Sequence, residues 1–139
     1  MVNVAIVVAV ALVALAVGWA MQKRAPDAPT SPAHTVPTQI DRADFARPDA
    51  PWLVAVFTSD TCATCAKVWQ AAQPLESDVV AVEALEVKQA AHLHERYAIT
   101  AVPAVIMADD AGVVRGSFLG PPTTADLWAK LADLRATEG

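Results

Sequence analysis

The chain has 139 residues, a net charge of −5 at pH 7 and a hydrophobic fraction of 55%, above the roughly 45–50% of typical soluble domains. This length allows one domain with an appendage, and scattered acids without a basic run argue against a nucleic-acid partner. Two cysteines cannot build a disulfide scaffold, nor can they alone complete a structural zinc site, which usually takes four ligands.

The amino-terminal run Val2–Met21 is apolar, with Asn3 as its only strongly polar side chain. As a helix rising about 1.5 Å per residue, it would span roughly 30 Å, the thickness of the hydrocarbon core of a bilayer. Trp19 lies near its end, where an amphipathic ring suits the membrane interface. We therefore predict a transmembrane anchor over residues 1–21, with residues 2–21 in contact with membrane lipid.

A cleaved signal peptide is the alternative to this anchor. It requires a basic region before the apolar run, which the sequence lacks, and Gly18-Trp19-Ala20 is a weak cleavage site. Lys23 and Arg24 follow the run, so the positive-inside rule favours a single-pass cell-membrane protein with a cytoplasmic carboxyl-terminal side. The Pro-rich stretch 22–38 predicts a semi-rigid linker before a folded domain at 39–139.

The domain is predicted to alternate strands and helices. Short apolar runs rich in Val predict buried strands, and apolar residues three or four apart predict helices. Thr123 and Asp126 have the spacing of a helix capping box. In chain order the predicted elements are a short edge strand at 38–40, a brief helix capped by Asp41, a strand at 52–57, a helix from Cys62 ended or bent by Pro74, a strand at 79–87, a helix at 89–97, hairpin strands at 104–107 and 113–119, and a last helix after Thr123.

Cys62 and Cys65 carry the strongest chemical signal, because two residues separate them at a predicted strand–helix junction. A helix starting at Cys62 would offer unpaired N–H groups and a positive dipole end, which together favour a thiolate and lower its pKa. Cys65, one turn on, could then attack a mixed disulfide and release the substrate. Cys62 is thus the predicted attacking thiol and Cys65 the resolving thiol. Asp60 would oppose thiolate formation if its side chain turned inward.

Two other interpretations of the pair remain open. The cysteines could form half of a zinc site with His92 and His94, although histidines two apart on a helix do not face the same way. Alternatively, both cysteines could be small buried hydrophobic residues, against which the polar residues around them argue.

Most of the domain, from about Ile40 to Leu134, resembles the thioredoxin family. The resemblance rests on these segments: strand Leu53–Phe57 running into Cys62-Ala63-Thr64-Cys65, helix Ala91–Tyr97 followed by Ile99-Thr100, Ala101-Val102-Pro103-Ala104, and Asp110-Ala111-Gly112 with Gly120. It implies an α/β, thioredoxin-like three-layer fold with a central mixed β-sheet, here preceded by the predicted transmembrane helix. It also implies thiol–disulfide exchange that uses the Cys62–Cys65 disulfide and no further cofactor.

The resemblance implies in addition a cis peptide bond before Pro103, with this loop lying against the cysteines. The backbone of Val102 would then receive a substrate chain as an added strand, and Pro103 would deny the thiols a metal. Together with Thr61, Ala63 and Thr64, these two residues are the predicted substrate-binding positions.

The chain departs from the family's pattern around the cysteines. Thr61 replaces the family's aromatic residue before the first cysteine, and Ala63 and Thr64 replace the rigid dipeptide between the cysteines. Val56 stands where the family often buries an acid that helps move protons to the second thiol, and Gln70 stands where a helix-kinking proline is usual. These changes predict a specialised relative whose redox balance differs from that of a general reductant.

The leading hypothesis from the sequence is a membrane-tethered thiol–disulfide oxidoreductase, expected to be monomeric, that acts on protein or small-molecule disulfides. The alternative is a redox-silent binding module that uses the same fold to recruit a membrane or envelope partner. Two retained cysteines favour the enzyme, since a pure scaffold gains little from a reactive pair.

Overall fold

The computed structural model describes residues 2–23 and 36–138. The chain divides into two compact units, residues 1–33 and residues 34–139. The elements are α1 (Val2–Lys23), a 3-10 helix η1 (Arg42–Asp44), β1 (Trp52–Thr58), α2 (Cys65–Ala72), η2 (Gln73–Leu75), β2 (Val80–Glu86), α3 (Ala91–Arg96), β3 (Ala104–Ala108), β4 (Val114–Leu119) and α4 (Thr124–Thr137). The predicted linker, residues 22–38, lies largely outside the described residues.

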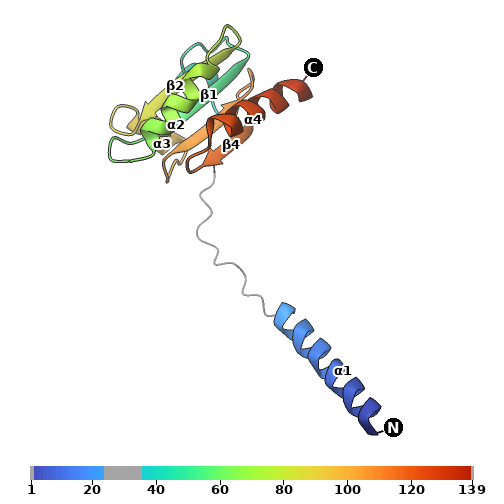
Figure 1. Ribbon diagram of the computed structural model, residues 1–139. Helices are drawn as coiled ribbons and strands as arrows, with labels where there is room; N and C mark the ends of the chain where they lie inside the picture. Colours follow the sequence, from blue (N-terminus) through green and yellow to red (C-terminus); the bar gives the residue numbers. More distant parts are fainter. Residues whose placement is uncertain (1, 24–35, 139) are drawn as a thin grey trace. The chain divides into compact units, whose positions relative to one another are not determined.

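Four strands form one mixed sheet in the order β2-β1-β3-β4 (Figure 1). β1 pairs in parallel with β2 and antiparallel with β3, and β3 pairs antiparallel with β4. Phe57 near the end of β1 therefore lies opposite Ala104 at the start of β3. This pairing brings the segment after β1 and the segment before β3 to the same end of the sheet.

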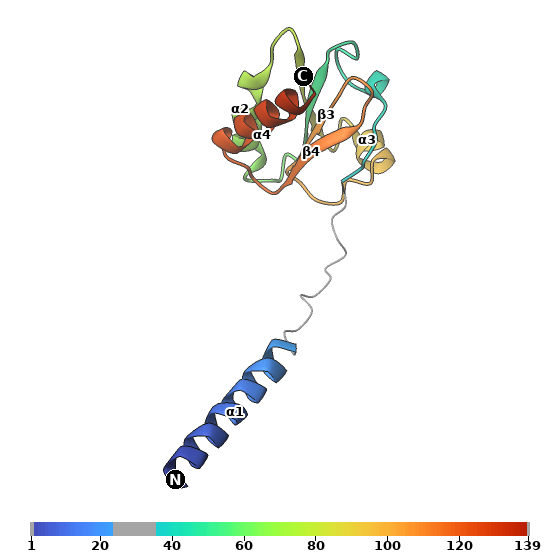
Figure 2. The same cartoon turned by 90° about the vertical axis from the view of Figure 1, so that its right-hand side faces the viewer.

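The sheet lies between two helical layers, as Figure 2 shows, with α2 and α4 on one face and α3 on the other. All seven residues of β1 are buried, and alternate side chains enter opposite cores because strand side chains point to alternate faces. Val54 and Val56 pack in the core with α2 and α4, whereas Leu53 and Phe57 pack in the core with α3. Each such buried side chain contributes roughly 1.5–3 kcal/mol through the hydrophobic effect. The predicted three-layer α/β fold with a mixed sheet is confirmed.

Most predicted boundaries agree with the structure to within a few residues. Pro74 follows the end of α2, where the chain tightens into η2. The hairpin turn between β3 and β4 forms as predicted, and Thr123 and Asp126 form the predicted capping box at the start of α4. Asp41 caps η1 by accepting a hydrogen bond from the Ala43 amide at 3.0 Å.

The predicted edge strand at 38–40 is reduced to a single bridge between Gln39 and Val113. The Ile40 amide donates to the Gly112 carbonyl at 2.8 Å, and the Val114 amide donates to the Thr38 carbonyl at 3.0 Å. The segment therefore ties the start of the domain to the β3–β4 turn without extending the sheet by a full strand.

The membrane anchor predicted over residues 1–21 is wrong. The run does form a helix, α1, and its side chains at 3–17 are exposed. A spanning helix must be both long and apolar enough to match the bilayer core. Within residues 2–23 and 36–138, no helix meets both requirements. The same finding overturns the predicted single-pass membrane location.

Candidate functional site

β1 leads directly into the loop that carries the two cysteines. After Thr58 the chain turns, and the Cys62 amide donates to the Ser59 carbonyl at 3.1 Å. The Ser59 hydroxyl contacts Thr61 twice, accepting from its amide at 3.3 Å and sharing a hydrogen bond with its hydroxyl at 3.0 Å. These local bonds give the loop a defined path from a fully buried strand to the surface.

Cys62 and Cys65 are joined by a disulfide, with an S–S distance of 2.18 Å and a Cα–Cα distance of 5.4 Å. Their exposures differ sharply. Cys65 is buried, with 2% of its surface exposed, whereas Cys62 is half-buried. A reacting thiol or disulfide from another molecule can therefore reach the pair at Cys62 more readily than at Cys65.

Helix α2 begins at Cys65, three residues later than the sequence predicts. Thr64 is its cap, without a side-chain capping bond, and Cys62 lies in the preceding turn. The prediction that Cys62 stands in the first helical turn is wrong. The disulfide nevertheless places the Cys62 sulfur beside the sulfur of the first helical residue, at the positive end of the helix dipole.

The Asp60 side chain does not turn inward. It is exposed and forms an ion pair with Lys88. The hydrogen bond from the Lys88 ammonium to its carboxylate lowers the pKa of Asp60 below the ordinary value. The Asp60 amide in turn donates to Glu86 Oε1 at 3.3 Å. The ammonium group of Lys88 thus offsets the charge of Asp60 at close range. Glu86 is held beside the cysteine loop by its hydrogen bond from the Asp60 amide.

A groove of about 230 Å³ opens beside the disulfide on the side of α2 and β2. Cys62 and Cys65 both line it, together with Trp69 of α2. On the β2 side, Ala84 contributes an apolar side chain to the groove and Glu86 contributes a polar one. No sequence motif marks either residue.

The Val102–Pro103 peptide bond is cis, as the family resemblance implies. Pro103 is buried, and its carbonyl accepts a hydrogen bond from the Gly120 amide at 2.9 Å. Because Ala104 pairs with Phe57, the sheet brings this loop to the end where the cysteine loop begins. Ser59 and Val102 line one common cavity, which confirms that the two loops are neighbours.

The other predicted site residues lie in the same two loops. Thr61, Ala63 and Thr64 are exposed around the disulfide, and the Thr64 hydroxyl lies 3.7 Å from the Cys62 sulfur. Val102 is half-buried. The structure thus brings all seven predicted site residues to one end of the sheet.

The two histidines do not join the cysteines. His92 is exposed, whereas His94 is buried and binds the Leu85 carbonyl through Nε2 at 2.8 Å. Among residues 2–23 and 36–138, no cluster of three or more His, Cys, Asp or Glu side chains is placed to hold a metal ion.

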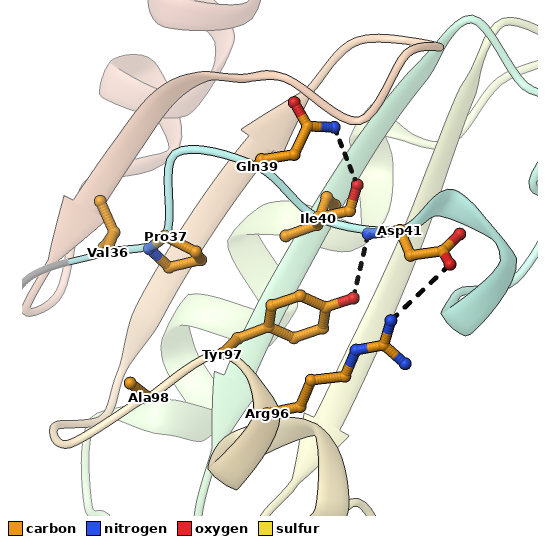
Figure 3. A pocket seen from close by; sticks show the side chains of 8 residues that line it. All are labelled: Val36, Pro37, Gln39, Ile40, Asp41, Arg96, Tyr97 and Ala98. Carbon is orange, nitrogen blue, oxygen red and sulfur yellow. Dashed lines mark hydrogen bonds and ion pairs between the residues drawn. The ribbon is translucent and has the colours of Figure 1, made fainter.

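A separate cavity of about 530 Å³ lies where the domain begins, between residues 36–41 and the end of α3 (Figure 3). Its polar groups bind one another. The Asp41 amide donates to the Tyr97 hydroxyl at 3.0 Å, and Arg96 pairs with Asp41 at 3.7 Å. Burial, and then the hydrogen bond to Asp44, raises the pKa of Tyr97. This cavity holds neither cysteine, and its bonds fasten the start of the domain to α3.

No protein-family model matches the sequence, and comparison with curated proteins also finds no match. Solved structures do match. The germline-specific thioredoxin Deadhead of Drosophila melanogaster is 22% identical with a TM-score of 0.55, over 63% of this chain and 84% of that chain. A thioredoxin mutant from Halobacterium salinarum is 24% identical with a TM-score of 0.51, over 62% of this chain and 73% of that chain.

The oxidized form of mitochondrial thioredoxin 3 from Saccharomyces cerevisiae is also similar, at 20% identity and a TM-score of 0.52. It matches over 60% of this chain and 79% of its own length. At these identities the likeness concerns the fold. The domain has the thioredoxin fold, with a Cys62–Cys65 disulfide at the end of its first central strand.

Proposed function

We propose that the domain at 39–139 is a thiol–disulfide oxidoreductase that cycles Cys62 and Cys65 between dithiol and disulfide. The observation that carries this proposal is the asymmetry of the pair. The half-buried Cys62 sulfur is bonded to the buried sulfur of Cys65, which begins α2. Exchange needs one accessible sulfur to meet the substrate and one shielded sulfur to complete the reaction internally.

In the reducing direction, the Cys62 thiolate attacks one sulfur of a substrate disulfide. A mixed disulfide forms between Cys62 and the substrate, and the other substrate sulfur leaves as a thiolate that takes up a proton. The Cys65 thiolate, formed by loss of its proton to solvent, then attacks the Cys62 sulfur. The Cys62–Cys65 disulfide forms, the second substrate thiol leaves, and two electrons have moved from the protein to the substrate. An external dithiol restores the starting state.

The loops around the disulfide are the proposed substrate-binding surface. Thr61, Ala63 and Thr64 are exposed and flank the accessible sulfur. Across from them, the Val102 backbone before cis-Pro103 would hydrogen-bond an extended substrate chain, as a strand added to a sheet edge does. Substrates of this kind are protein or peptide disulfides, whose backbone can make such bonds.

Disulfide reduction by Cys→Ser variants tests the proposal. With insulin as substrate and dithiothreitol as reductant, Cys62→Ser should lower the rate to that of dithiothreitol alone, because the attacking thiolate is gone. Cys65→Ser, the matched variant, is reduced and freed of dithiothreitol before insulin is added. It should then accumulate a mixed disulfide with the substrate, visible by mass spectrometry. Full activity of the Cys62→Ser protein would contradict the proposal.

A redox titration distinguishes this enzyme from the redox-silent binding module. The oxidized protein is equilibrated against graded ratios of reduced to oxidized dithiothreitol or glutathione, and free thiols are counted by alkylation and mass. We expect a reversible two-electron transition within the range of these couples. A pair that does not cycle anywhere in that range would favour the binding module.

A further inference from the structure

His94 is a buried titratable residue for which the proposed exchange chemistry has no role. Its side chain on α3 is 6% exposed, and its ring lies edge-on against Phe57 with 5.1 Å between ring centroids. Its Nε2 binds the Leu85 carbonyl at 2.8 Å. A carbonyl can only accept, so Nε2 carries the proton, and Nδ1 of the neutral ring is left as a hydrogen-bond acceptor.

His94 lines a cavity of about 230 Å³ between the cysteine loop and the cis-proline loop. Ser59 contributes from the first loop, and Ala101 and Val102 contribute from the second. Val87 and Ile99 make much of the remaining wall apolar. The cavity is large enough for one side chain, and it lies directly beside the backbone proposed to receive substrate.

Nδ1 of His94 is one acceptor at this cavity, whose lining also includes Thr100. The Ser59 hydroxyl is already engaged with Thr61. Within the described part of the chain, no residue bonds His94 Nδ1, and Arg42 Nε is the only fully buried side-chain polar atom without a partner. Nδ1 is therefore not fully buried, and the residue that carries it lines the cavity.

We propose that this cavity is a side-chain subsite, in which His94 Nδ1 accepts a hydrogen bond from a substrate residue beside the reacting cysteine. The inference rests on the proposed function and deepens it by naming a substrate class: peptide disulfides with a hydroxyl side chain, such as Thr, next to cysteine. Val has nearly the same shape as Thr and would leave the acceptor without a partner on binding. One net hydrogen bond corresponds to a preference of about three- to tenfold.

Two substitutions of His94 separate the subsite from the structural bond to Leu85. Gln extends its amide N–H to about the place of Nε2, so His94→Gln keeps the donor to the Leu85 carbonyl and removes the acceptor. Asn places its carbonyl near Nδ1, so His94→Asn keeps the acceptor and gives up the bond to Leu85. His92→Gln, on the exposed face of the same helix, is the matched control.

The experiment measures the second-order rate at which the reduced full-length chain reduces each of two symmetric peptide disulfides. One peptide has Thr on both sides of its cysteine, and the other has Val at both positions. We expect the wild type, His92→Gln and His94→Asn to prefer the Thr peptide by about three- to tenfold. His94→Gln should lose this preference. A ratio of two rates on one protein preparation is insensitive to a loss of folded protein.

Equal wild-type rates with both peptides would overturn the subsite and leave the proposed function standing. A Thr preference that survives in His94→Gln would also overturn it. Failure of the wild type to exchange with either peptide would instead contradict the proposed function, and this inference with it.

Discussion

The two ends of the central strands are built in opposite ways. At the end where β3 passes into β4, the buried Asp109 carboxylate accepts from the Val113 amide at 2.9 Å and from Arg115 Nε at 2.8 Å. The Asp109 carbonyl accepts from the buried Arg42 at 2.9 Å. Gly112 in the same turn lies so close to residue 40 that an added Cβ would stand 2.1 Å from the Ile40 carbonyl oxygen.

At the disulfide end, the corresponding space is open. The core beneath it has Val56 and not an acid, and the nearby ion pair between Asp60 and Lys88 is exposed. Two cavities lie beside the cysteine loop, and the second of them also borders the cis-proline loop. A Cβ added at Gly120 would meet nothing within 4 Å. The comparison separates two kinds of structure: the hairpin end is held by buried polar bonds, and the disulfide end leaves Cys62 partly exposed.

Replacing Gly112 or Gly120 by alanine should show the difference between the two ends of the sheet most strongly. Both have positive φ, 77° at Gly112 and 91° at Gly120, so each substitution costs roughly 1–2 kcal/mol in backbone strain. Gly112→Ala must also displace the backbone at Ile40, and we expect a total loss of at least about 3 kcal/mol. Denaturant unfolding of the oxidized protein measures both. Equal losses in the two variants would contradict the comparison.

Removing the buried carboxylate should have the next largest effect. Asp109→Ala leaves the Val113 amide and Arg115 without this partner, and we expect a loss of about 2–3 kcal/mol in unfolding free energy. The exposed neighbour Asp110 is the control, and Asp110→Ala should change stability by less than about 0.5 kcal/mol. Disulfide-exchange rates of the folded variants should match the wild type. A tenfold slower exchange would show that the two ends are coupled.

The ion pair at the disulfide end should have the smallest effect, visible as a shift in pKa. Lys88→Met should raise the pKa of Asp60 towards its ordinary value of 3.8. Because the folded-state pKa lies below the unfolded one, the pair stabilises the fold above about pH 3.8, and this contribution is lost as the pH falls through the lowered pKa.

Carboxyl resonances followed by NMR measure that shift. Asp126 serves as an internal control, because hydrogen bonds from Thr123 lower its pKa and do not depend on Lys88. An unchanged Asp60 pKa in Lys88→Met would show that the exposed pair has no influence in solution.

The core of the fold follows from local sequence patterns. β1 and β3 are short apolar runs whose length and valine content favour a buried strand. Thr123 with Asp126 marks a helix start by side-chain chemistry. The cysteine spacing and the segment at Pro103 identified both loops of the site. Their proximity depends on the register of β1 against β3, which pairs residues far apart in the chain.

What the patterns missed depends on contacts rather than on spacing. The sequence predicts the start of α2 three residues too early, because Cys62, Ala63 and Thr64 carry no apolar period that distinguishes a turn from a helix. The partners of Asp60 and His94, on β2 and the segment after it, come from tertiary packing. At the amino terminus the pattern predicts too much. The apolar run predicts a membrane span that the structure does not support.

Selective alkylation of the reduced protein tests the central claim most directly. The claim is that Cys62 presents the accessible, reactive sulfur and that Cys65 is shielded at the start of α2. After reduction and removal of reductant, a brief exposure to iodoacetamide is quenched, and modification of each cysteine is quantified by peptide mass spectrometry. We predict that Cys62 is modified at least about tenfold faster than Cys65. Equal modification, or faster modification of Cys65, would contradict the account.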